Sequence, residues 1–449
     1  MIPNHSCPRV RRQSRLTAVF VAQLATCLLS VSASAAARVA TDPTRPSDPV
    51  PVARSEGVLL GIDVLEQQQF NLLRGKRIGL LTHPAGKNRF GLSTIDVLRR
   101  DPRNNLVALF GPEHGIYGNE KADQPIDDQI DSRTGLPVFS LYGRYRKPTP
   151  AMLSKIDALV IDLQDLGVRS YTYISCMRYA IEACFENGVE VIVLDRPNPL
   201  GGWKVDGPPM DKEWMSYVGA FQVPYVHGLT IGELARISAS VPGVLHIAEA
   251  DRQRGRITVI PMRGWSRRMT WPETGLVWMP TSPNIPSYES VVGYAMTGLG
   301  AQLGGFRHGV GGNLPFRILT FRGQPLEVVE RALQERRIPG IAFTRRPFTN
   351  SQGHEATGLY VEVVDWTAWR PTELSCWMMQ IACELNPPNP FREATSSQAN
   401  LFNKHVGSTA WWESLIASGA AVDVRGFVAT WTESARSFQE KSRAYWLYP

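Results

Sequence analysis

Cysteine, long apolar segments and clusters of basic residues are all scarce in this sequence. The chain of 449 residues has six cysteines, and those that follow residue 37 are Cys176, Cys184, Cys376 and Cys383. Their spacing matches no zinc-binding motif. Two interpretations remain, namely one long-range disulfide or buried free thiols. No apolar stretch after residue 37 is long enough to span a membrane. Nucleic acid is a poor candidate partner, because no long basic run with interleaved aromatic residues occurs.

Motifs that bind a nucleotide or a catalytic metal are also missing. The first strand-like run is followed by Thr-His-Pro-Ala-Gly instead of Gly-x-Gly-x-x-Gly, and there is no Walker loop. We therefore expect no nicotinamide or nucleotide cofactor. His83, Glu113 and His114 are residue types that ligate metals, but they form no tight motif such as His-Glu-x-x-His. A metal-dependent hydrolase is accordingly a minor alternative.

The first 37 residues have the organisation of a secretory signal peptide. A basic segment precedes an apolar run, and the small residues Ala35 to Ala37 offer a cleavage site. Cleavage removes four arginines and no acid, so the Lys and Arg count falls from 48 to 44 against 41 acids. Residues 38–56 are rich in proline and predict an extended linker. We expect a secreted protein, and the arginine-rich leader without wall-binding repeats favours the periplasm.

Short apolar runs alternate with helical patterns from residue 57 onward. The runs cover 77–82, 105–110, 157–163 and 189–194, and the helical candidates cover 90–100, 150–156 and 172–186. Runs without polar alternation indicate strands that are buried on both faces, and their alternation with helices predicts a parallel, Rossmann-like sheet over residues 57–265. A strand pattern at 358–366 with helices at 371–385 and 425–445 predicts a smaller α+β domain over residues 266–449.

Polar side chains follow each of the four predicted strands. In open parallel sheets ligands bind beyond the carboxyl ends of the strands, so these turns are expected to line one crevice between the two domains. The turns supply His83, Glu113, His114, Gln164, Asp165, Arg169, Tyr173, Asp195, Arg196 and Asn198. One such residue alone is usually solvated or caps a turn, and Asp165 with Arg169 is compatible with a plain buried ion pair. All four turns together favour a catalytic crevice.

Two further segments carry candidate or structural residues. The loop at 275–290 is rich in proline and aromatic residues; Trp278 and Asn284 suit the face and the hydroxyls of a sugar, while a loop that covers the core with a buried tryptophan is the alternative. Thr230 and Glu233 have the spacing of a helix capping box, so we assign Glu233 no chemistry. His227 lies just before that helix, and two interpretations of it remain: it lines the crevice, or it is simply packed.

Five motifs occur together in a fixed order: GPEHGIYG, DLQDLGVRSYTY, LDRPNPLGG, HGLTIGEL and MPTSPNIP. With them, residues 57–449 resemble the bacterial exo-β-N-acetylmuramidase family. The resemblance implies a Rossmann-like domain with a smaller auxiliary domain. It also implies release of N-acetylmuramic acid from the non-reducing ends of peptidoglycan fragments or muropeptides. The proposed catalytic acid of the family falls on Glu113.

Glycoside cleavage needs the groups that the predicted crevice offers. A carboxylic acid protonates the leaving oxygen, and a second carboxylate or the substrate's own acetamido group assists. We assign Glu113 as the acid, His114 as a residue that orients it or contacts the sugar, and Asp165 as the second carboxylate. Arg169 or Arg196 suits the lactyl carboxylate of muramic acid. The other expected substrate contacts are His83, Gln164, Tyr173, Asn198 and Asn284.

The sequence departs from the family in two places. Thr297 stands where the family usually has an acid, and a glycine-rich insertion and Leu-Pro-Phe-Arg at 314–317 follow it. His83 stands where an asparagine is usual. Arg307 and His308 are candidates to take over a binding role. This divergence keeps a second hypothesis open, namely a muropeptide-binding protein with weak or no catalysis.

Overall fold

The computed structural model describes residues 57–118 and 127–449. The predicted signal peptide (1–37) and linker (38–56) lie outside the described residues, and both stay predictions. Among the helices that the structure describes, none combines the length and the apolar character needed to cross a bilayer.

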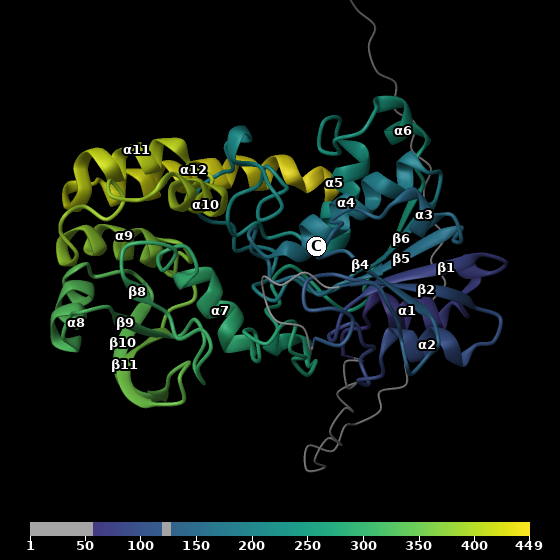
Figure 1. Cartoon of the computed structure of the whole chain (residues 1–449), viewed down its shortest axis with the longest axis horizontal. Coiled ribbons are helices and arrows are strands. Elements are labelled where there is room, and N and C mark those ends of the chain that lie inside the picture. Colours follow the sequence, from purple (N-terminus) through teal and green to yellow (C-terminus); the bar gives the residue numbers. More distant parts are fainter. Residues whose placement is uncertain (1–56, 119–126) are drawn as a thin grey trace, which may run out of the picture. The chain divides into compact units, whose positions relative to one another are not determined.

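A seven-stranded sheet is built from the N-terminal half of the chain (Figure 1). Its strands lie in the order β3-β4-β2-β1-β5-β6-β7, and all neighbours are parallel except β3, which runs antiparallel to β4 at one edge. The strands are β1 (Arg77–Thr82), β2 (Asn105–Gly111), β3 (Gln129–Ile130), β4 (Pro137–Ser140), β5 (Ala158–Asp162), β6 (Glu190–Leu194) and β7 (Ile257–Ile260). The predicted parallel sheet is thus confirmed, and each of the four predicted runs lies within one residue of a strand.

Helices cover both faces of this sheet, as its continuous apolar strands require. In Figure 1, α1 (Gly61–Gln67) and α2 (Thr94–Arg100) lie on one side, and α4 (Thr172–Glu186) and α5 (Ile231–Ser240) on the other. Alternate residues of a strand therefore enter different cores: Leu80 packs with α1 and α2, whereas Leu81 packs with α4. Gly79 leaves no room for a side chain, because a Cβ there would lie 2.8 Å from the Phe110 ring.

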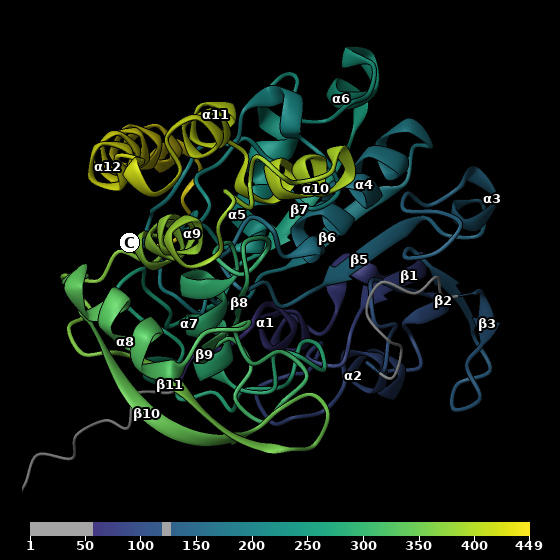
Figure 2. The same ribbon diagram turned by 60° about the vertical axis from the view of Figure 1, so that its left-hand side comes forward.

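The C-terminal half forms a second, antiparallel sheet with its own helices. The strands β8 (Phe306–Arg307), β9 (Ile318–Phe321), β10 (Ile341–Thr349) and β11 (Glu355–Val363) lie in the order β10-β11-β9-β8. Figure 2 shows α9 (Glu373–Leu385) between α8 (Leu326–Glu335) and α12 (Val424–Ser442). The remaining helices are α3 (Pro150–Leu153), α6 (Glu249–Arg254), α7 (Tyr288–Thr297), α10 (Ser396–Val406) and α11 (Thr409–Ser418). The predicted fold class is confirmed, and the domain boundary at 265 stays a prediction.

The end of the chain returns to the first sheet. The Tyr448 hydroxyl donates to Asp195, which follows β6, and the Leu447 N–H donates to Glu233 at 2.9 Å. Glu233 also completes the predicted capping box, since its carboxylate accepts from the Thr230 N–H at 3.0 Å. A buried ion pair with Arg267 (2.6 Å) adds to these contacts. Glu233 therefore holds the C-terminal tail as well as the start of α5.

All four described cysteines are buried free thiols, so the alternative of a disulfide is wrong. Burial raises the pKa of the Cys176 thiol to about 12, which keeps it protonated.

Candidate active site

The carboxyl ends of β2, β1, β5 and β6 lie side by side at one edge of the sheet. The chain runs outward from β1 to β2 and β4, then returns to β5 on the other side of β1. This reversal of strand order is the place where open α/β sheets bind ligands. The structure therefore brings the four predicted turns to one edge.

Glu113 lies in a tight turn directly after β2. The Gly115 N–H donates to the Pro112 carbonyl at 3.0 Å, and His114 and Gly115 both adopt φ of +71°. The Glu113 side chain is half-buried, and its Oε2 accepts a hydrogen bond from Thr172 Oγ1 at 2.9 Å. Because Thr172 is the first residue of α4, the carboxylate also lies near the positive end of a helix dipole.

Tyrosines from several elements surround this carboxylate. Burial, the charge of Glu113 and a hydrogen bond to it raise the pKa of Tyr142. Burial raises the pKa of Tyr294 to about 12, and the charges of Glu113 and Asp165 add to the shift. The Arg146 guanidinium lies 3.8 Å from the centre of the Tyr142 ring. These phenols stay protonated, so the setting provides hydrogen-bond donors and one cation around a single carboxylate.

Asp165 faces a histidine from a distant part of the chain. Its Oδ2 accepts from the Gly167 N–H at 2.8 Å and lies 3.2 Å from His227 Nε2. The Leu229 N–H donates to His227 Nδ1, which leaves the proton on Nε2, facing Asp165. The suggested ion pair of Asp165 with Arg169 is therefore wrong, and His227 is packed against the carboxylate. The other oxygen, Oδ1, is buried and accepts no hydrogen bond from the described residues.

His83 and Tyr173 join the neighbouring strand ends. His83 Nε2 accepts from the Gln164 N–H at 2.8 Å, and its ring meets Tyr173 edge-on at 4.7 Å. Burial and the nearby Arg196 hold the pKa of His83 well below its usual value, so the ring is a neutral acceptor. The Tyr173 hydroxyl donates to the Thr281 carbonyl at 2.7 Å and lies 3.3 Å from the Glu113 carbonyl oxygen. Both predicted residues therefore contact the Glu113 turn or its neighbours.

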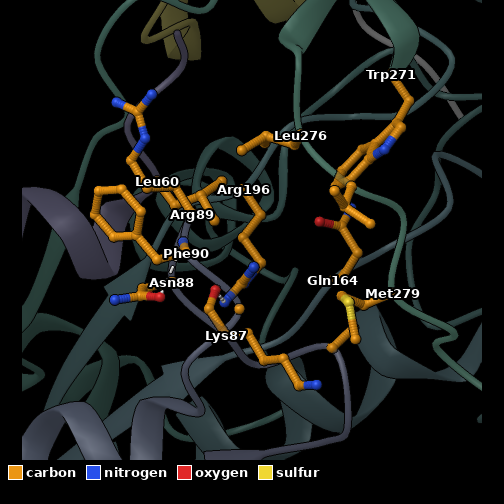
Figure 3. A pocket seen from close by; sticks show the side chains of 13 residues that line it. Leu60, Lys87, Asn88, Arg89, Phe90, Gln164, Arg196, Trp271, Leu276 and Met279 are labelled. Atoms are coloured by element: carbon orange, nitrogen blue, oxygen red, sulfur yellow. Dashed lines mark hydrogen bonds between the residues drawn. The ribbon is translucent and has the colours of Figure 1, made fainter. Parts of the chain in front are cut away.

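Gln164 and Arg196 line a cavity of about 260 Å³ at the same edge (Figure 3). Arg196 forms a buried pair with Asp162, the last residue of β5, through Nε–Oδ1 (2.5 Å) and Nη2–Oδ2 (2.8 Å). Sequence reasoning missed Asp162 because it ends an apolar run and counted as part of the strand. Its carboxylate already occupies two nitrogens of the guanidinium that the lactyl group was expected to use.

Arg169 and Asn198 hold the backbone together. The Arg169 side chain is 0% exposed, and its terminal nitrogens donate to the carbonyls of Pro208, Val223, His405 and Val406. Burial lowers the pKa of Arg169 to about 10. Asn198 is buried, donates to the Leu229 carbonyl at 3.0 Å and accepts from the Leu200 N–H. This geometry gives both residues a structural role and does not favour the predicted contacts with substrate.

The last two predicted site residues are His114 and Asn284. His114 is buried and lines a cavity of about 330 Å³ with residues of β3 and β4. Asn284 is half-buried in the loop at 275–290, where Trp278 donates to the Ile285 carbonyl at 3.3 Å and meets Trp271 edge-on. Their assigned roles stay predictions. Sequence reasoning also missed Arg146 and Tyr142, which precede α3 in a segment without a recognised motif.

The divergent segment from 297 to 317 contacts this site through aromatic rings. Thr297 is 0% exposed, and its hydroxyl lies 3.1 Å from the Gly293 carbonyl oxygen and 3.0 Å from that of Phe316. The Phe316 ring stacks on His308 at 4.7 Å and meets Tyr294 at 4.9 Å. Thr297 is therefore a buried tie between α7 and the turn at Phe316, whose ring supports Tyr294.

No group of three or more His, Cys, Asp or Glu side chains arranged to hold a metal ion occurs within residues 57–118 and 127–449.

Comparison with known families decides which family this chain belongs to. The N-terminal model of exo-beta-N-acetylmuramidase NamZ matches residues 78–289, and the C-terminal model of the same family matches residues 292–448. The chain belongs to the NamZ family. The resemblance that the sequence motifs indicated is thereby confirmed.

Known NamZ and DUF1343 proteins match most of the chain. Peptidoglycan beta-N-acetylmuramidase NamZ of Bacillus subtilis (strain 168) is 36% identical over 400 residues, which are 88% of this chain and 92% of the relative. A crystal structure of a DUF1343 family protein from Bacteroides fragilis NCTC 9343 superimposes with a TM-score of 0.77 at 37% identity, covering 87% of this chain and 99% of the other. The structure of a second DUF1343 protein of that bacterium superimposes with a TM-score of 0.65 at 27% identity, with the same coverage of both chains. These structures share the fold described above.

Proposed function

We propose that this protein is a secreted exo-β-N-acetylmuramidase that releases N-acetylmuramic acid from the non-reducing ends of peptidoglycan fragments, with Glu113 as general acid. As a NamZ family member the chain is a glycoside hydrolase, and its B. subtilis relative is named as a peptidoglycan β-N-acetylmuramidase. The predicted signal peptide supports a periplasmic location.

The observation that carries the choice of acid is the placement of Glu113. Among the strand-end carboxylates it is half-buried, whereas Asp162, Asp165 and Asp195 are buried. A partly accessible carboxyl can deliver a proton to the leaving glycosidic oxygen, as the reaction requires. Thr172 fixes one of its oxygens, so the group is oriented before the substrate arrives.

Asp165 is the candidate for the second group. The Gly167 N–H donates to one oxygen, which also lies 3.2 Å from His227 Nε2, and the other oxygen has no donor among the described residues. An unoccupied carboxylate oxygen can accept a proton from water or the N–H of the substrate's acetamido group. Both tasks would promote attack at the anomeric carbon from the side opposite to the leaving group.

Arg146 is the best-placed cation for the lactyl carboxylate of muramic acid. It is half-buried, stacks between the rings of Tyr142 and Tyr217, and is in no ion pair with the described residues. A guanidinium held flat by aromatic rings keeps its donor edge available for a carboxylate. In this proposal Arg146 takes the role for which the sequence suggested Arg169 or Arg196.

The decisive experiment measures release of the aryl group from an aryl β-N-acetylmuraminide. The protein lacking residues 1–37 is compared with Glu113→Gln and with the corresponding glucosaminide as substrate. We expect turnover of the muraminide and its loss in Glu113→Gln. Normal turnover by the variant would contradict the role of Glu113.

The divergence at 297–317 favours a second candidate, a muropeptide-binding protein. Tight binding of a muropeptide in calorimetry, without release of N-acetylmuramic acid, would support it. Efficient release would exclude it.

A further inference from the structure

A further cavity, of about 460 Å³, lies in the C-terminal half of the chain. Its walls come from the end of α8, the turn before β10, the start of α9 and the adjoining part of α12; Figure 2 shows these three helices side by side. The lining residues all fall within 336–373 and 425–436. None of them belongs to the N-terminal sheet or to the turns at its edge, so the candidate active site does not account for this cavity.

Five arginines and two glutamates line the cavity, which we call the arginine cleft. Three of the arginines are paired with glutamates: Arg370 with Glu373 (3.2 Å), Arg436 with Glu433 (2.5 Å) and Arg336 with Glu384. The other two, Arg337 and Arg425, are exposed. Their side chains form no ion pair or hydrogen bond with any residue that the structure describes. Two cations of the cleft are therefore free to meet an anion.

Arg337 stands where a smaller residue is usual. It follows the last turn of α8 with a left-handed φ of +49°, and its N–H donates to the Gln334 carbonyl at 3.1 Å. Glycine or asparagine is preferred at this position after a helix, because most other residues are strained in that conformation. Local stability therefore does not explain an arginine at 337.

Arg425 is also at a place that disfavours it. It is the second residue of α12, and the first turn of this helix contains no acid. The positive end of the helix dipole repels a cation there. Both unpaired arginines thus break a local rule of stability, and such departures are expected where a residue serves binding.

The turn that carries Arg337 is fixed against its neighbours. Gly340 adopts φ of +75°, and a Cβ there would lie 2.5 Å from the Trp369 backbone nitrogen, so this turn packs closely on the segment before α9. The Arg336 Nε donates to Gln380 Oε1 of α9 at 3.1 Å. The walls of the cleft are therefore held in place without a ligand, which lowers the ordering cost of binding.

The lining favours a phosphate group over a sugar or a base. None of the described lining residues is aromatic, so no ring is available for stacking. A phosphate ester carries about two negative charges near pH 7 and three acceptor oxygens, which arginine binds bidentately. The two unpaired guanidinium groups can neutralise these charges without breaking an ion pair. Pro339, Val428 and Ala429 offer a small apolar wall to the esterified carbon.

We propose that the arginine cleft binds a phosphate ester, with Arg337 and Arg425 as its ligands. Two sources present this group: a free phosphorylated solute, and the headgroup of an anionic phospholipid. The inference goes beyond the proposed reaction, because no residue of the cleft belongs to the candidate active site.

Two measurements on the protein lacking residues 1–37 test the proposal. Isothermal titration calorimetry with sn-glycerol 3-phosphate measures binding of a free ester, with glycerol as the probe that lacks the phosphate. Co-sedimentation with vesicles of equal parts phosphatidylglycerol and phosphatidylcholine, against phosphatidylcholine alone, measures binding of the headgroup.

Arg337→Asn and Arg425→Gln each remove one of the unpaired cations. We expect each variant to weaken binding about tenfold or more. Neither should lower the midpoint of urea unfolding, because asparagine suits the left-handed position and glutamine removes a cation from the start of a helix. Arg331→Gln is the matched control, since Arg331 is exposed on α8, unpaired within the described residues and outside the cleft.

Saturable binding that both cleft variants weaken, and Arg331→Gln leaves intact, supports the proposal. Association with the phosphatidylglycerol vesicles identifies the lipid headgroup as the source, and binding of the ester without association with vesicles identifies a free solute. Absence of binding in both measurements overturns the proposal. Binding that Arg331→Gln weakens as much as the cleft variants also overturns it, because the attraction is then one of overall charge.

Discussion

The turns after β2 and β6 both present an acid at the same edge of the sheet, yet they use it differently. Glu113, after β2, is half-buried, with Thr172 as donor to one of its oxygens. Asp195, after β6, is 0% exposed and accepts from the Thr230 and Tyr448 hydroxyls and the Gly232 N–H. An acid after a strand can thus serve a site or hold the chain together, and access to solvent separates these two acids.

The largest expected effect is that of Glu113→Gln on turnover. This variant tests whether Glu113, unlike Asp195, serves the reaction and not the fold. The amide keeps the shape and the acceptor for Thr172 but cannot deliver a proton, so we expect muraminide turnover to fall about 10²- to 10⁴-fold. The free energy of unfolding in urea should change by less than about 0.5 kcal/mol, as for a site that does not hold the fold. A large loss of stability would place Glu113 with Asp195 among the structural acids.

Arg169→Met tests the opposite case, a buried residue that holds the fold together. The substitution leaves the four carbonyls that Arg169 binds without their donors, and we expect the free energy of unfolding to fall by about 3 kcal/mol or more. Urea unfolding measures this loss, and Arg100→Met on the exposed side of α2 is the control. The preference of the folded protein for muraminide over glucosaminide should not change. A changed preference at unchanged stability would restore the contact with the lactyl group that the sequence suggested.

Asp195 should make stability depend on pH. Burial, with the charge of Glu233 adding, raises the pKa of Asp195 from 3.8 to about 7. The folded state then binds a proton between these values that the unfolded state has released, so this residue stabilises the fold at low pH. Its contribution falls as the pH rises from about 4 through 7. Urea unfolding at several pH values measures the slope, and Asp195→Asn should remove it. An identical slope in the variant would contradict the assignment.

The two arginines show what sequence can and cannot predict here. The strands were predictable because their apolar runs are continuous, and the family because its motifs are specific. Arg169 follows a predicted strand, whereas Arg146 lies in a segment without a recognised motif. Only tertiary packing buries Arg169 beneath four carbonyls and places Arg146 on the ring of Tyr142, which is hydrogen-bonded to Glu113. The pair of Asp165 and His227 was equally hidden, because the two residues lie far apart in sequence.

Arg146→Met should have a moderate and selective effect. If the guanidinium binds the lactyl carboxylate, its removal lowers the ratio of kcat/KM for muraminide to that for glucosaminide by about tenfold. Arg144→Met is the control, because Arg144 is exposed and stacks on Tyr145. An equal fall with both substrates would instead indicate that Arg146 supports the Glu113 turn without contacting the lactyl group.

The smallest effect is expected at Thr297, where the family usually has an acid. Thr297→Val keeps the shape but removes the hydroxyl beside the Gly293 and Phe316 carbonyls, so the free energy of unfolding should fall by about 1 kcal/mol. Thr430→Val is the matched control, because that hydroxyl also bonds a carbonyl of its own helix but is exposed, and its loss should cost less. Muraminide turnover should fall only slightly, through the support that Phe316 gives to Tyr294. A fall of a hundredfold at unchanged stability would instead place Thr297 in the reaction, and the divergence of this segment would then be a change of chemistry and not of packing.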